Sequence, residues 1–218
     1  MSPRRSFLGI IFRIAAGFML GLNPAVSLIR RAYAQSKRIL LPKGTKMTSL
    51  VAKNPADLDT RNLEVIPLTQ FETMGLTDHK TDLDIWRLTV TGEVKKPLKL
   101  TYDQVLELPS IARNVLLICP GFFTNHGRWK GISIAKLLKL AKADEGITHV
   151  SIRGPEGRYA KVEGFSISEI TANQVFLAYQ VNGQELPRKH GFPLRTVAED
   201  HYGSEWVKFV DHIEAHKI

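Results

Sequence analysis

Turn-forming residues are frequent in this chain, and they predict many turns and short strands. The 218 residues include 16 Gly and 11 Pro, and pairs such as Pro120-Gly121 and Asn182-Gly183 end regular structure where they occur. These residues favour tight turns because proline fixes its φ angle and glycine and asparagine tolerate a positive one. We therefore expect short strands and short helices, and the pattern argues against a helical bundle.

Several segments have the pattern of β-strands. Apolar and polar residues alternate from Trp86 to Thr91, which is the two-residue period of a half-buried strand. A continuous apolar run at residues 115–118 predicts a strand that is buried on both faces. The strands expected from such patterns are residues 86–91, 98–100, 115–118, 149–152, 159–162, 175–181 and 184–186.

Short helices are expected between these strands. Thr101, Ser133 and Ser166 each precede a short helical pattern, and Ser166 with Glu169 has the spacing of a capping box. The helices do not alternate regularly with the strands, so a doubly wound parallel sheet is not expected. The sequence predicts an α+β domain.

The first 34 residues have the three parts of an export signal: a charged start, an apolar middle and Ala-Tyr-Ala at residues 32–34. The pair Arg4-Arg5 is typical of a twin-arginine signal, which directs the export of proteins that are already folded. A retained membrane anchor is the alternative, since about twenty apolar residues can span a bilayer, although Arg13 weakens such a helix. We expect a cleaved signal and a periplasmic protein.

The formal charge of +9 is concentrated in this leader. Residues 1–34 contain five arginines and no acidic residue, which leaves 25 basic against 21 acidic residues in the rest of the chain. The remaining excess is too small to indicate nucleic-acid binding by itself. We therefore expect no nucleic-acid partner.

Cys119 is the one cysteine of the chain, which excludes an internal disulfide and a multi-cysteine metal site. It lies where Pro120-Gly121 ends a buried strand, a place where a side chain can face a cleft. A thiolate is a soft ligand that suits a transition metal, and a single thiolate requires that the metal arrive bound to an organic cofactor. The alternative is a small buried apolar residue.

Other polar residues leave further alternatives open. A Cys–His hydrolase would need His126 or His190 beside Cys119. A basic cluster late in the chain is either a solvated face or a pocket for a phosphate. Its members are Arg188, Lys189, His190, Arg195 and Lys208.

An ordered series of motifs runs through residues 69–213. It consists of Trp86-x-Leu-x-Val-x-Gly92-Glu93-Val94-x-x-Pro97-Leu98, Cys119, Trp129-x-Gly131, Asn182-Gly183-x-x-Leu186-Pro187, His190-Gly191-x-Pro193-x-Arg195 and Tyr202-Gly203-x-x-Trp206-Val207-Lys208. This series resembles the molybdopterin-binding domain of the sulfite oxidase family, and within that family the exported methionine sulfoxide reductases. The resemblance implies a mixed-sheet domain at residues 69–218, after the signal segment and an irregular segment at residues 35–68.

The resemblance also implies a molybdenum–molybdopterin cofactor. Cys119 corresponds to the thiolate that binds molybdenum, and is the expected catalytic and metal-binding residue. The family's usual Asn and Tyr are missing from the loop that begins at Thr69, Gly154 replaces a Thr, and His190 matches the His of sulfite oxidases. The positions expected to contact the cofactor are Thr69, Glu72, Thr73, Gly154, His190, Arg195, Trp206, Val207 and Lys208.

The function that the resemblance implies is oxygen-atom transfer at sulfur or another heteroatom of a small substrate. Residues 120–126 are expected on the substrate side, and His126 and Arg128 are candidates for substrate contact. The expected electron partner is a membrane haem protein or a soluble cytochrome. Two alternatives remain: a sulfite-type oxidase, favoured by His190, and a non-catalytic module that retains the fold, suggested by the altered loop.

Overall fold

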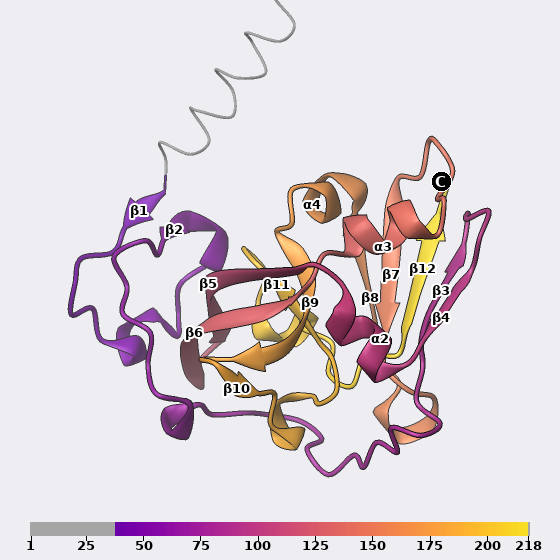
Figure 1. Cartoon of the computed structure of the whole chain (residues 1–218). Helices are drawn as coiled ribbons and strands as arrows, with labels where there is room; N and C mark the ends of the chain where they lie inside the picture. The colour runs from indigo at the N-terminus through magenta and orange to yellow at the C-terminus, as the bar shows by residue number, and fades with distance from the viewer. Residues whose placement is uncertain (1–37, 218) are drawn as a thin grey trace, which may run out of the picture. The chain divides into compact units, whose positions relative to one another are not determined.

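The computed structural model describes residues 38–217 (Figure 1). The chain divides into two compact units, Met1–Ile39 and Leu40–Ile218. Every described helix, and every described strand after β1, belongs to the second. The expected export signal lies outside the described residues. Among the residues that the structure describes, no helix is long and apolar enough to cross a membrane.

Two five-stranded sheets form the framework of the second unit. The first is antiparallel throughout, in the order β10-β9-β6-β5, with β11 also paired to β9. Its strands are β5 (Ser110–Cys119), β6 (Phe123–Ile132), β9 (Val175–Val181), β10 (Gln184–Glu185) and β11 (Arg195–Ala198).

The second sheet has the order β4-β3-β12-β7-β8 and is mixed, because β12 runs parallel to β3 and antiparallel to β7. Its strands are β3 (Leu88–Gly92), β4 (Leu98–Leu100), β7 (His149–Arg153), β8 (Val162–Ser166) and β12 (His212–His216). Two further short strands, β1 (Ile39–Leu40) and β2 (Leu58–Asp59), lie outside both sheets.

The helices are as short as the sequence indicates, and the architecture confirms the α+β class. The Thr101 hydroxyl accepts from Gln104 N, the Ser166 hydroxyl accepts from Glu169 N, and both N-termini have complete capping boxes. The α-helices of residues 38–217 are α2 (Tyr102–Glu107), α3 (Ile134–Leu140) and α4 (Ile167–Thr171). Six 3-10 turns complete the elements of this described part: η1 (Met47–Leu50), η2 (Pro55–Asp57), η3 (Leu68–Gln70), η4 (Gly157–Tyr159), η5 (Arg188–His190) and η6 (Gly203–Glu205).

One predicted strand was placed too early in the chain. The hairpin partner of β7 begins at Val162 rather than at residue 159, because residues 157–159 form the turn η4. The N–H of Gly154 donates to Lys161 O at 3.1 Å and closes a loop of six intervening residues. This longer loop carries side chains that reach the site described below.

Residues 115–118 of β5 are buried on both faces of the strand, as their apolar run predicts. Leu116 and Ile118 pack into a small cluster with Leu41, Leu50, Leu58 and Leu63. Leu117 instead belongs to the main core, with residues of both sheets, and Cys119 packs against that core. Because successive side chains of a strand point to opposite faces, residues 41–63 cover one face of β5 and leave Leu117 and Cys119 on the other.

Candidate functional site

A tight turn between two paired strands fixes Cys119. It is the last residue of β5 and pairs with Phe123, the first residue of β6. The Phe122 N–H donates to Cys119 O at 3.0 Å, and Gly121 adopts a φ of +78°, which a residue with a side chain rarely adopts. The thiol is therefore held rigidly by its backbone.

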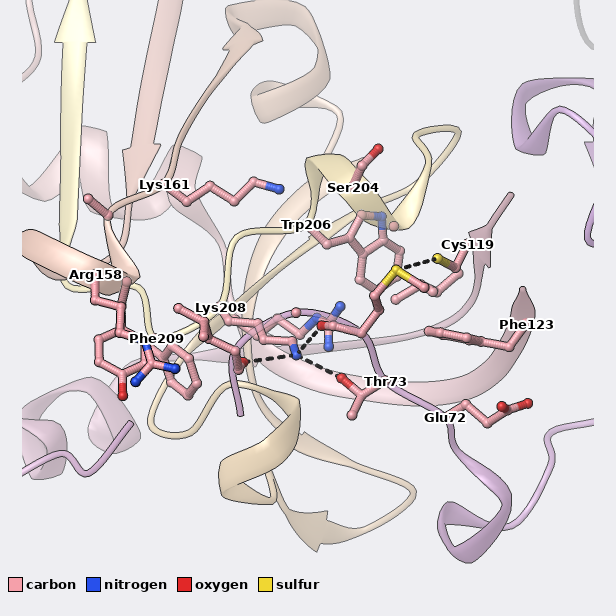
Figure 2. A pocket seen from close by; sticks show the side chains of 18 residues that line it. Glu72, Thr73, Cys119, Phe123, Arg158, Lys161, Ser204, Trp206, Lys208 and Phe209 are labelled. Carbon is pink, nitrogen blue, oxygen red and sulfur yellow. Dashed lines mark hydrogen bonds between the residues drawn. The ribbon is translucent and has the colours of Figure 1, made fainter. Parts of the chain in front are cut away.

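Cys119 lines a cavity of about 410 Å³ (Figure 2). The cavity is built from four parts of the chain that are far apart in sequence. Its lining residues are Glu72–Leu76, Leu117, Cys119 and Phe123, Arg158–Lys161, and Arg195 together with Gly203, Ser204, Trp206, Lys208 and Phe209.

The cavity is strongly basic. Arg158, Lys161, Arg195 and Lys208 line it, against the single carboxylate of Glu72. In Figure 2, Arg158 and Lys161 lie on the side of the cavity away from Cys119. Such a distribution of charge suits an anionic ligand that extends from the thiol toward the basic side.

Arg195 is a buried cation. Arg195 is 4% exposed. Its guanidinium carbon lies 5.4 Å from the ring centroid of Trp206 and 5.7 Å from that of Trp129. Nη1 donates to His190 O at 3.0 Å, whereas Nε has no hydrogen-bond partner. Among residues 38–217 no carboxylate forms an ion pair with it, and burial lowers the pKa of Arg195 to about 10.

Lys208 adds a second cation beside Arg195. Its Nζ donates to Thr73 Oγ1 at 2.7 Å and to Met74 O at 2.9 Å. Burial, followed by the nearby charges of Arg195 and Lys161, lowers the pKa of Lys208 to about 8. A buried cation (Arg195) beside a half-buried one (Lys208), with no carboxylate partner among residues 38–217, is costly in a folded chain. This part of the cavity is therefore suited to an anion that would compensate them.

Other buried polar atoms also indicate a ligand in the cavity. Trp206 Nε1 and His190 Nε2 are buried and have no hydrogen-bond partner. Burial, then the charges of Arg195, Lys189 and Lys208, lowers the pKa of His190 to about 3, so this imidazole is neutral. Buried polar groups normally have partners. Unpartnered groups in and beside the cavity therefore fit a ligand with hydrogen-bonding atoms.

The structure brings most of the residues expected at the site to this cavity. Six of them line it: Glu72, Thr73, Cys119, Arg195, Trp206 and Lys208. Three others are buried behind its wall. Gly154 packs against the Lys208 backbone, where a Cβ atom would lie 2.9 Å from Lys208 O; Val207 accepts from Thr196 N; and His190 accepts from Arg195 through its carbonyl.

Three expected site residues lie elsewhere. Thr69 is exposed in η3 and does not line the cavity. His126 points to the face of β6 opposite Phe123, where its Nδ1 lies 3.0 Å from Glu64 O, and burial lowers its pKa. Arg128 is exposed on β6 and is not part of the cavity either. Both side chains lie outside this cavity because side chains alternate along the strand, and their contact with substrate stays a prediction.

A Cys–His pair is not formed. The Cys119 thiol has the thioether of Met74 as its hydrogen-bond partner, with the two sulfur atoms 3.9 Å apart. Burial raises the pKa of the thiol, which is opposite to the activation that a thiolate nucleophile needs. The hydrolase alternative therefore lacks its base.

Several lining residues were missed by the sequence analysis. Met74 lies directly against Cys119, and Arg158, Tyr159 and Lys161 come from the loop after β7. The two cations of that loop are visible in the sequence, but only the length of the loop brings them to the cavity. Among the described residues, no group of three or more His, Cys, Asp or Glu side chains could hold a metal ion. A metal at Cys119 therefore needs ligands from outside the chain.

A histidine clamps the wall of the cavity formed by η6. His201 Nδ1 lies 2.8 Å from Glu205 Oε1 in η6, and Nε2 lies 2.7 Å from Glu169 Oε1 in α4. Burial lowers the pKa of His201, but the hydrogen bonds and charges of Glu205 and Glu169 outweigh it, so the net pKa is raised. Protonated His201 thus ties α4 to the turn that carries Gly203 and Ser204.

This clamp should weaken as the pH rises. A raised pKa means that the stabilisation is complete below the unfolded-state value of about 6.5 and is lost as the pH passes through the folded-state value. We expect the variant His201→Gln to be less stable than wild type by about 1 kcal/mol at pH 6, with the difference shrinking toward pH 9. Thermal unfolding of both proteins across this range measures it. A difference that is constant with pH would contradict the clamp.

The fold and the cavity define a class of protein: an α+β domain whose cavity holds one rigidly fixed thiol and a basic side that includes the buried cation Arg195. The chain belongs to the oxidoreductase molybdopterin-binding domain family, whose model matches residues 75–217. It is thus a molybdopterin-binding oxidoreductase domain of the sulfite oxidase family.

Known proteins similar to this chain include several enzymes. The catalytic subunit of a protein-methionine-sulfoxide reductase from Gluconobacter oxydans is 32% identical over 143 residues, which cover 59% of this chain and 46% of that protein. An NADH nitrate reductase from Ulva prolifera is 26% identical over 210 residues, which cover 79% of this chain and 24% of that protein. The chain therefore spans less than half the length of these relatives.

A solved structure with the same fold is the sulfane dehydrogenase SoxCD of Paracoccus pantotrophus. The TM-score is 0.60 at 21% identity, and the match covers 64% of this chain and 40% of that chain. This likeness confirms the expected fold of the molybdopterin-binding domain.

Proposed function

We propose that this protein is an exported molybdopterin-dependent oxidoreductase that transfers an oxygen atom at sulfur, or at another heteroatom, of a small organic substrate. The observation that carries the proposal is the cavity itself. It places a single thiol at one side of a basic chamber in which buried Arg195 and half-buried Lys208 lack a carboxylate partner among the described residues. This donor set fits a cofactor that combines a soft metal with an anionic phosphate.

The cofactor, when bound, supplies a metal that can change its oxidation state by two electrons and exchange an oxygen atom. The protein's own residues bind and orient it. Cys119 would supply the thiolate ligand, after losing the thiol proton that burial favours. Arg195, whose Nε has no hydrogen-bond partner, would hold the anionic end, and Trp206 would offer its indole N–H.

The choice of sulfur rests on the similarity to the methionine-sulfoxide reductase of Gluconobacter oxydans. In the reducing direction, a sulfoxide takes up two electrons and two protons and yields a thioether and water. The electrons would come from a haem protein, either in the membrane or soluble. Oxidation of sulfite is the second candidate, because His190 matches the histidine of sulfite oxidases and lies behind Arg195.

Export completes the proposal. The Arg4-Arg5 pair and the Ala-Tyr-Ala at residues 32–34 support a twin-arginine signal and a periplasmic location. This route suits a cofactor enzyme, because the protein crosses the membrane after folding around its cofactor.

One preparation tests these points together. The full chain is expressed in a bacterial host supplied with molybdate, recovered from the periplasm, and analysed for molybdenum and pterin. We expect about one molybdenum per chain, reduction of an organic sulfoxide with an artificial electron donor, and slower turnover with sulfite or nitrate. The double variant Arg4→Lys and Arg5→Lys should remain in the cytoplasm. Correctly folded protein without molybdenum would contradict the proposed function.

A further inference from the structure

One wall of the cavity is a strap, residues 72–79, that has no regular secondary structure. Its beginning is fixed by one buried side chain. Asn125, which is 2% exposed on β6, accepts from Glu72 N at 3.1 Å and donates through Nδ2 to Glu72 O at 2.8 Å. Two hydrogen bonds from one buried amide hold the first residue of the strap firmly.

The middle of the strap crosses Cys119. Lys208 Nζ donates to Thr73 Oγ1 and to the carbonyls of Met74 and Leu76, the last at 3.4 Å. The Met74 side chain lies against the Cys119 thiol, as the dashed line between the two sulfur atoms in Figure 2 shows. The strap therefore lies over the thiol.

The far end of the strap is fastened to the opposite wall. Asp78 Oδ1 accepts from the Tyr159 hydroxyl at 3.1 Å, and Asp78 Oδ2 lies 3.5 Å from Arg158 Nη1. The His79 ring packs against Tyr159 and Phe209, with centroid distances of 4.7 Å and 4.8 Å. We call Asp78, His79, Arg158 and Tyr159 the latch.

The latch is the weakest of the three attachments. The Arg158 and Asp78 side chains are 66% and 59% exposed, and exposed ion pairs contribute little because water and salt screen them. The Asn125 and Lys208 contacts are more deeply buried. When the strap opens, the latch should therefore separate first and the strap should turn about Glu72.

We propose that the strap is the gate of the cofactor cavity: the latch must open for molybdopterin to be inserted, and its closure retains the cofactor afterwards. The inference rests on the proposed function, since it assumes that the cavity holds this cofactor. The geometry supports it because the strap and the loop of Arg158–Lys161 are two facing walls of the cavity, and the latch joins them. In this role Asp78 and Tyr159 are positioning residues.

Rates of cofactor exchange test the gate. Loaded full-length protein is diluted, and the pterin that remains bound is measured over time by its fluorescence after oxidation. We expect Asp78→Ala to release pterin about three to ten times faster than wild type, and Tyr159→Phe, which keeps the ring, to have a smaller effect of the same sign. Uptake of free cofactor by the emptied variant should also be faster, whereas a contact that only adds affinity would change release alone.

The salt dependence of the release rate distinguishes the latch from other causes of pterin loss. Added salt should speed release from wild type, because it screens the Asp78–Arg158 pair, and should have less effect on Asp78→Ala. Glu145→Ala, which removes an exposed carboxylate from the loop after α3, is the matched control and should behave like wild type. Equal release rates in wild type and Asp78→Ala would overturn the gate.

Limited trypsin digestion tests the strap without the cofactor. Lys80 is exposed and follows the latch directly, so opening should expose the bond after it. We expect cleavage there to be about three to ten times faster in Asp78→Ala than in wild type or Glu145→Ala. If wild-type protein contains no pterin, the proposed function fails, and the digestion still decides about the strap: equal cleavage rates would overturn it.

Discussion

Replacing Cys119 with serine should abolish turnover while leaving the fold, and most of the pterin, in place. Serine is nearly the same size as cysteine, so a cysteine with a purely structural role would tolerate the change with a modest loss of stability. A hydroxyl, however, is a hard donor that is rarely ionised near neutral pH, and it is a poor ligand for a metal that prefers thiolate. No other thiolate can replace Cys119 at this point. The sulfur atom beside it belongs to Met74 and is a thioether, and the turn at Gly121 fixes the position of residue 119.

The measurement combines turnover with the absorption spectrum. We expect activity to fall to background and the sulfur-to-molybdenum charge-transfer band to disappear, with pterin content close to that of wild type because the basic residues still hold the anionic end. Ser110→Ala, at the other end of β5 and exposed, is the matched control and should keep both signals. If Cys119→Ser retains the band and the turnover, Cys119 is a core residue and not the metal ligand.

The sequence predicted the elements whose signals are local, whereas the strands β6 and β11 were not predicted. The capping boxes at Thr101 and Ser166 need only residues within one helical turn, and both are present. The hairpin at Asn182-Gly183 needs only a turn with positive φ angles, which both residues adopt. The buried run in β5 was also recognised, because a strand covered on both faces has no polar alternation.

The cavity could be predicted only in part, because its walls come from segments that are far apart in sequence. The motif residues Cys119, Arg195 and Lys208 do meet there. His126 lies on the face of β6 opposite Phe123, away from the cavity. A position close to Cys119 in sequence could not show this, because it reveals neither the turn of three residues nor the phase of the following strand. Met74 was missed for the opposite reason: it lies 45 residues before Cys119 and is brought to the thiol by Lys208.

Replacing Arg195 with methionine should have opposite effects on the empty and the loaded protein. In the empty protein, Arg195 is a buried cation with no carboxylate partner among the described residues, and its pKa of about 10 reflects the cost of burial. That cost is about 3 kcal/mol, since one pKa unit corresponds to about 1.4 kcal/mol. The contacts with Trp129, Trp206 and His190 O recover part of it. Methionine fills the space without the charge, so the empty variant should be about 1 kcal/mol more stable than wild type.

With cofactor present, the same change should weaken retention. A guanidinium can make charge-assisted hydrogen bonds to a phosphate, and its loss inside a buried site costs on the order of 2–5 kcal/mol. We therefore expect pterin affinity to fall by at least about thirtyfold, even though the empty variant unfolds at a higher temperature, by about 2–4 °C.

Two measurements on one variant distinguish this role from a structural one. Thermal unfolding of cofactor-free protein should show Arg195→Met above wild type, and pterin retained after dialysis should show it far below. Arg188→Met, seven residues earlier and exposed, should change neither value appreciably. A residue that only supports the fold would lower the unfolding temperature of the empty protein. Only a residue that is kept for its ligand should lower the stability of the protein when the ligand is absent. A lower unfolding temperature of empty Arg195→Met, or normal retention of pterin by this variant, would therefore contradict the assignment of Arg195 to the anionic end of the cofactor.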